Sequence, residues 1–105
     1  MTRACLFVYG SLKRDGRHHA ELGGAPFLST ARTLAGYALE PLGEYLALVE
    51  APGPGCVPGE LFEVEEHQLE DLDTFEGEGY ARMPLMVIAQ NGENVAALAY
   101  LRRTR

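Results

Sequence analysis

Residues 4–12, with the sequence ACLFVYGSL, carry the clearest structural signal in the chain. The first six are apolar or aromatic and rich in strand formers, which predicts a buried strand that stops at Gly10. A glycine there would let the chain turn sharply and leave backbone N–H groups facing outward, where they can bind an anion or an oxyanion without a positive side chain. A Gly-Ser pair after a strand is otherwise an ordinary turn.

Most of the remaining chain also has the composition of strands. Residues 27–40 carry an apolar alternation and predict one long or bent strand, and a turn at residues 41–43 separates it from a neighbouring strand over residues 44–50. Further strands are predicted over residues 57–64, 80–90 and 94–102. The last two are joined by Asn91-Gly92, the strongest short hairpin signal available.

One segment has the period of a helix. Leu69, Leu72 and Phe75 recur three residues apart between polar residues, which predicts a helix over residues 65–76 with one apolar stripe. Gly77 is well placed to end this helix. A second, shorter helical turn is compatible with residues 17–22.

These elements define the expected fold class. Five or six strands, one clear helix and a second short one do not form the alternating pattern of a repeated βαβ sheet. We therefore expect a single α+β domain over residues 1–105, with a mostly antiparallel or mixed sheet that curls into a small barrel. A chain of this length can bury a core without disulfide bonds.

Charge argues against nucleic acid as a partner. The 105 residues carry a formal net charge of −6. A protein that binds the phosphate backbone needs clustered Lys and Arg, and inside this chain only Lys13, Arg14 and Arg17 cluster. The apolar run near the start is too short for a bilayer span or for the core of a secretory signal, so we expect a cytoplasmic protein without a membrane partner.

The Cys and His residues of the sequence do not have the spacing of a metal site. Cys5 and Cys56 lie in unrelated contexts, and we expect them to be free thiols that are buried or half-buried. His18 and His19 are adjacent and therefore point in different directions, while His67 falls on the surface of the predicted helix. We expect no metal and no cofactor, and the sequence carries no readable signal for the oligomeric state.

Acidic residues are concentrated around the predicted helix, where eight carboxylates fall between residues 63 and 78. Most are expected to form a solvated face. Glu76 differs because it occupies the last turn, beside Phe75 and before Gly77, where the helix dipole disfavours an anion. An apolar wall and a negative dipole end would raise its pKa toward the range in which a carboxyl can take and return a proton. On spacing alone, a structural role for Glu76 is the commoner alternative.

Five short motifs follow one another in a recognisable order. They are residues 8–14 (VYGSLKR), the pair His18-His19, residues 59–62 (GELF), residues 72–77 (LDTFEG) and residues 80–82 (YAR). Each is weak alone, but their order and spacing together resemble the gamma-glutamyl cyclotransferase-like superfamily. The YGSLK opening is similar in particular to the gamma-glutamylamine cyclotransferase branch and its small bacterial relatives.

This resemblance implies a fold, an activity and a site. The fold is a small mixed barrel with helices packed outside it. The activity is the release of 5-oxoproline and a free amine from a small γ-glutamyl substrate, by attack of the substrate's own α-amino group. The resemblance places the substrate-binding loop on Tyr9, Gly10, Ser11 and Leu12, and the catalytic glutamate, which acts as general base and then acid, on Glu76.

Several alternatives stay open at this level. The same fold and pocket could serve a non-catalytic domain that binds a small molecule or a partner, although the presence of Glu76 favours the enzyme. Among enzymes, hydrolysis or acyl transfer at a related amide is the second alternative. The walls that contact the released amine are expected around Tyr37, Tyr45 and residues 52–54. Arg82 could fix the carboxylate of Glu76 or pair with an acidic neighbour on the surface, and we favour the second.

Overall fold

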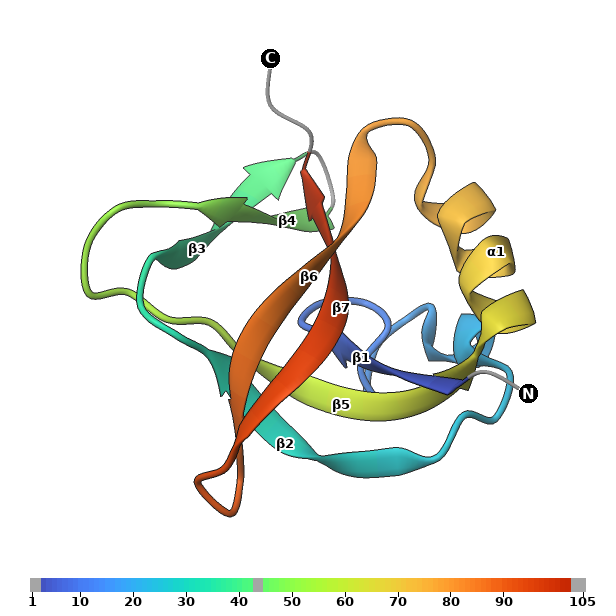
Figure 1. Ribbon diagram of the computed structural model, residues 1–105. Helices are drawn as coiled ribbons and strands as arrows, with labels where there is room; N and C mark the ends of the chain where they lie inside the picture. The colour runs from blue at the N-terminus through green and yellow to red at the C-terminus, as the bar shows by residue number, and fades with distance from the viewer. Residues whose placement is uncertain (1–2, 43–44, 103–105) are drawn as a thin grey trace.

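The computed structural model describes residues 3–42 and 45–102 (Figure 1). Within these ranges the chain forms the strands β1 (Arg3–Val8), β2 (Phe27–Thr33), β3 (Tyr37–Leu42), β4 (Tyr45–Glu50), β5 (Pro58–Glu65), β6 (Tyr80–Ala89) and β7 (Asn94–Arg102). It also forms the short 3₁₀ helix η1 (His19–Leu22) and the α-helix α1 (Glu66–Glu76). Gly43 of the predicted turn and Glu44 of the predicted strand lie outside the described residues.

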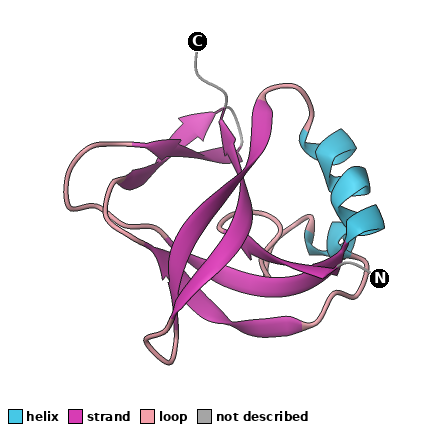
Figure 2. Cartoon of the chain, in the orientation of Figure 1, coloured by secondary structure: helices cyan, strands magenta, loops and turns pink. Residues whose placement is uncertain are grey.

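Five of the strands close into a barrel. Their order is β1-β5-β2-β6-β7 with antiparallel neighbours, and β7 returns to pair in parallel with β1 through Leu98 and Leu6. The hairpin of β3 and β4 extends the sheet beyond β7, where Leu48 pairs in parallel with Leu101. Figure 2 shows α1 lying outside the barrel. The expected mixed α+β barrel is therefore confirmed, although its sheet has seven strands in the described residues rather than five or six.

The prediction of one strand over residues 27–40 is wrong, because the chain forms β2 and β3 there. The two strands have different neighbours, since β2 lies between β5 and β6 while β3 pairs with β4. Thr33 closes β2: its N–H donates to the Val57 carbonyl (2.9 Å), and its Oγ1 accepts from the Val57 N–H (2.9 Å). Gly36 then takes a left-handed φ of 106°, which turns the chain away from the barrel.

The helix α1 begins and ends where the sequence supplies partners for its backbone. At its start Glu65 and Gln68 form a capping box, in which the Glu65 N–H donates to the Gln68 side chain (2.8 Å). At its end Gly77 has a φ of 80°, and its N–H donates to the Asp73 carbonyl (3.1 Å). The predicted helix and its glycine stop are confirmed, and Glu76 is its last residue.

Alternate residues of β1 enter two different clusters of the core. Leu6 and Val8 pack with Leu72 of α1, and all three side chains are buried. Phe7 points to the other side of the strand and packs in a second cluster that includes Leu48 of β4. Because β1 is covered on both faces, its carboxyl end is held firmly in place.

The cysteines differ in exposure. Cys5 in β1 is half-buried, whereas Cys56 is exposed, so the prediction of a buried or half-buried thiol is wrong for Cys56. The cause is the Pro- and Gly-rich loop around Cys56, which runs outside the core. In the described part of the chain, none of the helices has the length and apolar character needed to cross a membrane.

Candidate active site

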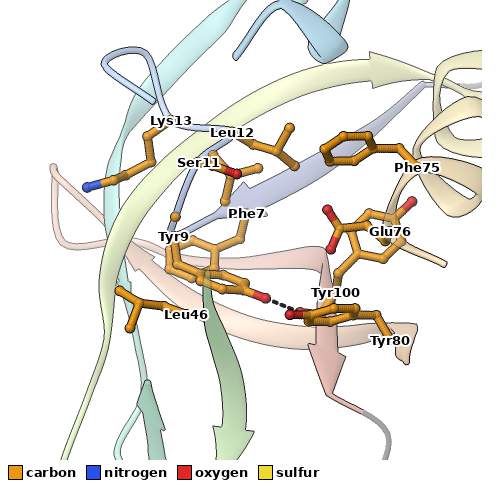
Figure 3. Close-up of a pocket in the computed structure, with 12 residues that line it drawn as sticks. Phe7, Tyr9, Ser11, Leu12, Lys13, Leu46, Phe75, Glu76, Tyr80 and Tyr100 are labelled. Atoms are coloured by element: carbon orange, nitrogen blue, oxygen red, sulfur yellow. Dashed lines mark hydrogen bonds between the residues drawn. The ribbon is translucent and has the colours of Figure 1, made fainter. Parts of the chain in front are cut away.

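A cavity of about 440 Å³ opens between the end of β1, the last turn of α1 and the beginning of β6 (Figure 3). This volume lies within the range of small-molecule sites. The five residues predicted for the site all line it; they are Tyr9, Gly10, Ser11, Leu12 and Glu76. Other lining side chains come from neighbouring positions and from β4 and β7, and they include Phe7, Lys13, Leu46, Phe75, Tyr80 and Tyr100.

The carboxylate of Glu76 points into this cavity (Figure 3). Its side chain is partly buried, and burial raises the pKa of Glu76 from the usual value near 4.5 to about 7. Three aromatic side chains, those of Phe75, Tyr80 and Tyr100, stand in the same wall. Near neutral pH a carboxyl with this pKa is present in both its ionised and its protonated form, which suits proton transfer in both directions.

The loop after β1 leaves backbone N–H groups without partners at the cavity wall. Among the described residues, none accepts a hydrogen bond from the N–H of Gly10, Ser11 or Leu12. The loop is held through its carbonyls instead, since Gly10 accepts from the Lys13 N–H (3.1 Å) and Ser11 accepts from the His18 N–H (2.8 Å). Unpaired amides beside a cavity can bind a carboxylate or a developing oxyanion.

Gly10 serves this wall through its missing side chain and not through its backbone conformation. The chain turns at Gly10 as expected, since the Gly10 carbonyl accepts from the Lys13 N–H (3.1 Å), but the φ of Gly10 is outside the left-handed region and is open to other residues. A Cβ at Gly10 would meet no atom within 4 Å. Because Gly10 lines the cavity, any side chain at this position would begin to fill the space that a ligand needs.

Gly16 supports the same loop, and sequence reasoning missed it. A Cβ at Gly16 would lie 2.1 Å from the Ser11 carbonyl oxygen, so only a glycine lets the chain fold back this closely against Ser11. The only signal in the sequence was a glycine in a polar segment, which by itself marks a loop and no particular contact.

Tyr9 is a fixed part of the cavity wall. Its hydroxyl donates to the Tyr100 carbonyl (2.6 Å). Burial raises the pKa of Tyr9 far above its usual value, and the neighbouring charge of Glu76 adds to the effect. The hydroxyl therefore stays protonated at physiological pH. It joins the end of β1 to β7, and the dashed line in Figure 3 marks this hydrogen bond.

A network behind the cavity holds α1 against the barrel. The Tyr100 hydroxyl donates to Asp73 Oδ1 (2.7 Å), and Asp73 Oδ2 pairs with the Arg82 guanidinium (3.3 Å). Arg82 therefore pairs with an acidic neighbour, Asp73, and not with Glu76. Pairing with an acidic neighbour is the alternative that the sequence favoured. Asp73 and Glu76 lie on adjacent turns of the helix, so the network fixes the backbone that carries Glu76.

The expected walls for the released amine are placed differently in the structure. Neither Tyr37 nor residues 52–54 line the cavity, and the Tyr45 side chain lies outside the described part of the chain. The prediction fails because β3, which carries Tyr37, lies at the end of the sheet, beyond β4. The exposed side chains of Leu46 and Phe75 line the cavity instead.

The side chains of His18 and His19 both contact the loop after β1. His18 Nδ1 lies 3.1 Å from Ser11 Oγ, and His19 Nδ1 lies 2.9 Å from the Leu12 carbonyl oxygen. His67 is exposed on α1. Within residues 3–42 and 45–102, no group of three or more His, Cys, Asp or Glu side chains is arranged to hold a metal ion.

Comparison with known proteins identifies related sequences over nearly the whole chain. The family model described as gamma-glutamyl cyclotransferase, AIG2-like, matches residues 6–105. A gamma-glutamylaminecyclotransferase of Rattus norvegicus is 40% identical over 82 residues, which cover 70% of this chain and 55% of the rat protein. Gamma-glutamylaminecyclotransferase C of Danio rerio is 37% identical over 101 residues, which cover 85% of this chain and 66% of the zebrafish protein.

A solved structure shows the same arrangement of elements. The crystal structure of an AIG2-like protein from Mus musculus superposes with a TM-score of 0.88 at 32% sequence identity, covering 100% of this chain and 80% of the mouse chain. The chain spans only about half the length of the rat relative and of the human gamma-glutamylaminecyclotransferase, of which the alignments cover 55% and 53%.

Proposed function

The chain belongs to the gamma-glutamyl cyclotransferase, AIG2-like family, and from this premise we propose that it converts a γ-glutamyl amine or amide into 5-oxoproline and a free amine. One observation carries the proposal. The Glu76 carboxylate, with its raised pKa, lines the same cavity as the unpaired amides of the loop after β1. The cavity therefore combines a group that can transfer protons with backbone donors that can bind an anion, and the reaction requires both.

The chemistry requires little from the protein beyond positioning and proton transfer. The α-amino nitrogen of the substrate attacks its own γ-carbonyl carbon, so a new C–N bond closes a five-membered lactam. The bond between the γ-carbon and the departing nitrogen then breaks, and that nitrogen leaves with a proton. Because both reacting groups belong to one molecule, holding the curled conformer supplies most of the proximity.

Glu76 would move the protons. The α-ammonium cannot attack until it loses a proton, and its reference pKa is about 8. Transfer to a carboxylate whose pKa is about 7 is uphill by roughly one pH unit, or about 1.4 kcal/mol. Transfer to an exposed glutamate, with a pKa near 4.5, would cost about 5 kcal/mol. The burial of Glu76 therefore removes most of this barrier, and the neutral carboxyl can then protonate the departing nitrogen.

The amides of Gly10, Ser11 and Leu12 would bind the negative part of the substrate. They could hold its α-carboxylate or the oxyanion that develops on the γ-carbonyl oxygen. Backbone donors carry no net charge, so this arrangement lets a chain with a net charge of −6 hold an anionic ligand. Leu12 is itself buried, which fixes the loop to the core.

Mass-spectrometric detection of 5-oxoproline from a panel of γ-glutamyl amines and dipeptides tests the proposal. The wild-type chain should form it from at least one member, and Glu76→Gln should lower the rate by about 10²- to 10⁴-fold. The matched control is Glu70→Gln, which alters an exposed carboxylate on the same helix and should leave the rate unchanged. A rate for Glu76→Gln close to wild type would refute the role of Glu76. Binding of the panel without any 5-oxoproline would favour the non-catalytic alternative.

A further inference from the structure

His18 contacts both halves of the candidate site, although it does not line the cavity. Its backbone N–H donates to the Ser11 carbonyl (2.8 Å), and its ring Nδ1 lies 3.1 Å from the Ser11 hydroxyl oxygen. On its other side the imidazole packs against the ring of Phe75, with 5.1 Å between ring centroids. Phe75 directly precedes Glu76 at the end of α1. A single side chain thus links the substrate loop to the helix turn that carries the carboxylate.

We propose that His18 is a positioning residue, which orients the Ser11 hydroxyl toward the α-carboxylate of the γ-glutamyl substrate. This role rests on the proposed function, because it presumes that the loop binds the glutamyl part of the substrate. Ser11 lines the cavity, and the proposal assigns its hydroxyl to a ligand bound there. His18 acts on that ligand through Ser11.

The chemistry of the two groups sets the direction of their hydrogen bond. A carboxylate only accepts hydrogen bonds, so the Ser11 hydroxyl must keep its own proton available for it. This requires His18 to donate its Nδ1–H to Ser11 Oγ. His19 also carries its proton on Nδ1, because this nitrogen lies 2.9 Å from the Leu12 carbonyl oxygen and a carbonyl oxygen can only accept a hydrogen bond. Both rings therefore hold the loop as donors.

The hydrogen bond restricts a group that would otherwise rotate freely. An isolated serine hydroxyl turns about its χ1 and C–O bonds, and fixing it before the ligand arrives lowers the entropy that binding must overcome. The contact with Phe75 ties the imidazole to α1, so the hydroxyl is fixed relative to Glu76 and not only relative to its own loop. We therefore expect His18 to affect substrate binding more than the chemical step.

Two variants separate the hydrogen bond from the ring contact. His18→Asn keeps a donor near the position of Nδ1 and loses the ring, whereas His18→Phe keeps a ring against Phe75 and loses the donor. We expect His18→Phe to raise KM about tenfold, the effect of one lost hydrogen bond to a charged ligand, with kcat changed by less than about threefold. His18→Asn should restore most of the wild-type KM. The exposed His67→Asn is the control.

The opposite pattern would overturn the proposal. A wild-type KM for His18→Phe, an equally poor KM for His18→Asn, or a loss confined to kcat would each contradict a role in orienting Ser11. In the Ser11→Ala background, exchanging His18 for Phe should have no further effect on KM, and independent, additive effects would also refute the coupling.

A second measurement does not depend on turnover. Nitrogen-15 NMR of the imidazole groups should show the proton of His18 on Nδ1 in the wild-type protein, and Ser11→Ala should lower the share of this tautomer. An unchanged His18 signal in an active protein would overturn the positioning role alone. A wild-type protein that forms no 5-oxoproline from any γ-glutamyl compound would instead overturn the proposed function, and with it the assignment of a substrate carboxylate to Ser11.

Discussion

Replacing Glu76 by glutamine should stabilise the fold at pH 8 and have little effect on its stability at pH 4.5. In the folded protein burial raises the pKa of this carboxyl to about 7, while in the unfolded chain it returns to about 4.5. Between these two values the unfolded chain releases its proton first, so the free energy of unfolding of the wild type falls as the pH rises. Glutamine does not titrate and escapes this loss.

The size of the effect follows from the same shift. A rise from 4.5 to about 7 corresponds to at most about 3.4 kcal/mol at about 1.36 kcal/mol per pH unit. The side chain is only partly buried and faces a cavity, so solvent screening reduces this value, and we expect about 1–2 kcal/mol at pH 8. For a chain of 105 residues that amounts to an increase in Tm of about 5–10 °C.

Thermal and urea unfolding of the wild type, Glu76→Gln and Glu70→Gln between pH 4.5 and pH 8 measure this difference. The stability gain of Glu76→Gln should grow through this window and level off above about pH 7, and the exposed control Glu70→Gln should follow the wild type. A Tm difference for Glu76→Gln that does not vary with pH would show that the Glu76 carboxyl is solvated in the folded state and would remove the physical basis for proposing Glu76 as the base.

The remaining predictions concern the rate profile and two glycines. The value of kcat/KM should rise through about pH 7 as Glu76 ionises, and it should fall at higher pH as the substrate amine or an enzyme group loses its proton. A rise of kcat/KM centred near pH 4.5 would contradict the raised pKa of Glu76. Gly10→Ala should keep the Tm within a few degrees of the wild type, because the added Cβ meets no atom within 4 Å. It should nevertheless raise KM several-fold, because the methyl group occupies cavity space, and an unchanged KM would place the substrate elsewhere. Gly59→Ala should lower the free energy of unfolding, measured in urea, by about 2–4 kcal/mol, because the new Cβ would lie 2.2 Å from the Val8 carbonyl oxygen across the β1–β5 pair. An unfolding midpoint equal to that of the wild type would refute this close packing.

The parts of the fold that depend on neighbouring residues could be predicted from the sequence. The apolar run that becomes β1, the three-residue spacing that becomes α1 and the glycine that ends the helix each act within a few residues. Asn91-Gly92 lies in the turn between β6 and β7, as predicted, and Gly92 takes the left-handed φ of 89° that such a turn requires. The position of Glu76 at the end of α1 followed from the same local rules.

The tertiary structure decided everything that depends on partners distant in the sequence. Thr33 ends β2 because Val57 is opposite it, and closure of the barrel brings Leu6 beside Leu98, which no local pattern encodes. Tyr37 lies away from the cavity for the same kind of reason, because the order of the strands and not their composition places β3 at the end of the sheet.

The site combines both kinds of information. The residue types at Glu76 and in the loop after β1 could be read from the sequence, but the burial that raises the pKa of Glu76 arises only when the end of α1 packs beside the end of β1 and the tyrosines Tyr80 and Tyr100 at one cavity. The partners of His18 and Gly16 were likewise invisible, since each depends on how the loop folds back on Ser11. Desolvation and close packing are properties of the space around a residue, and that space exists only once distant segments have come together.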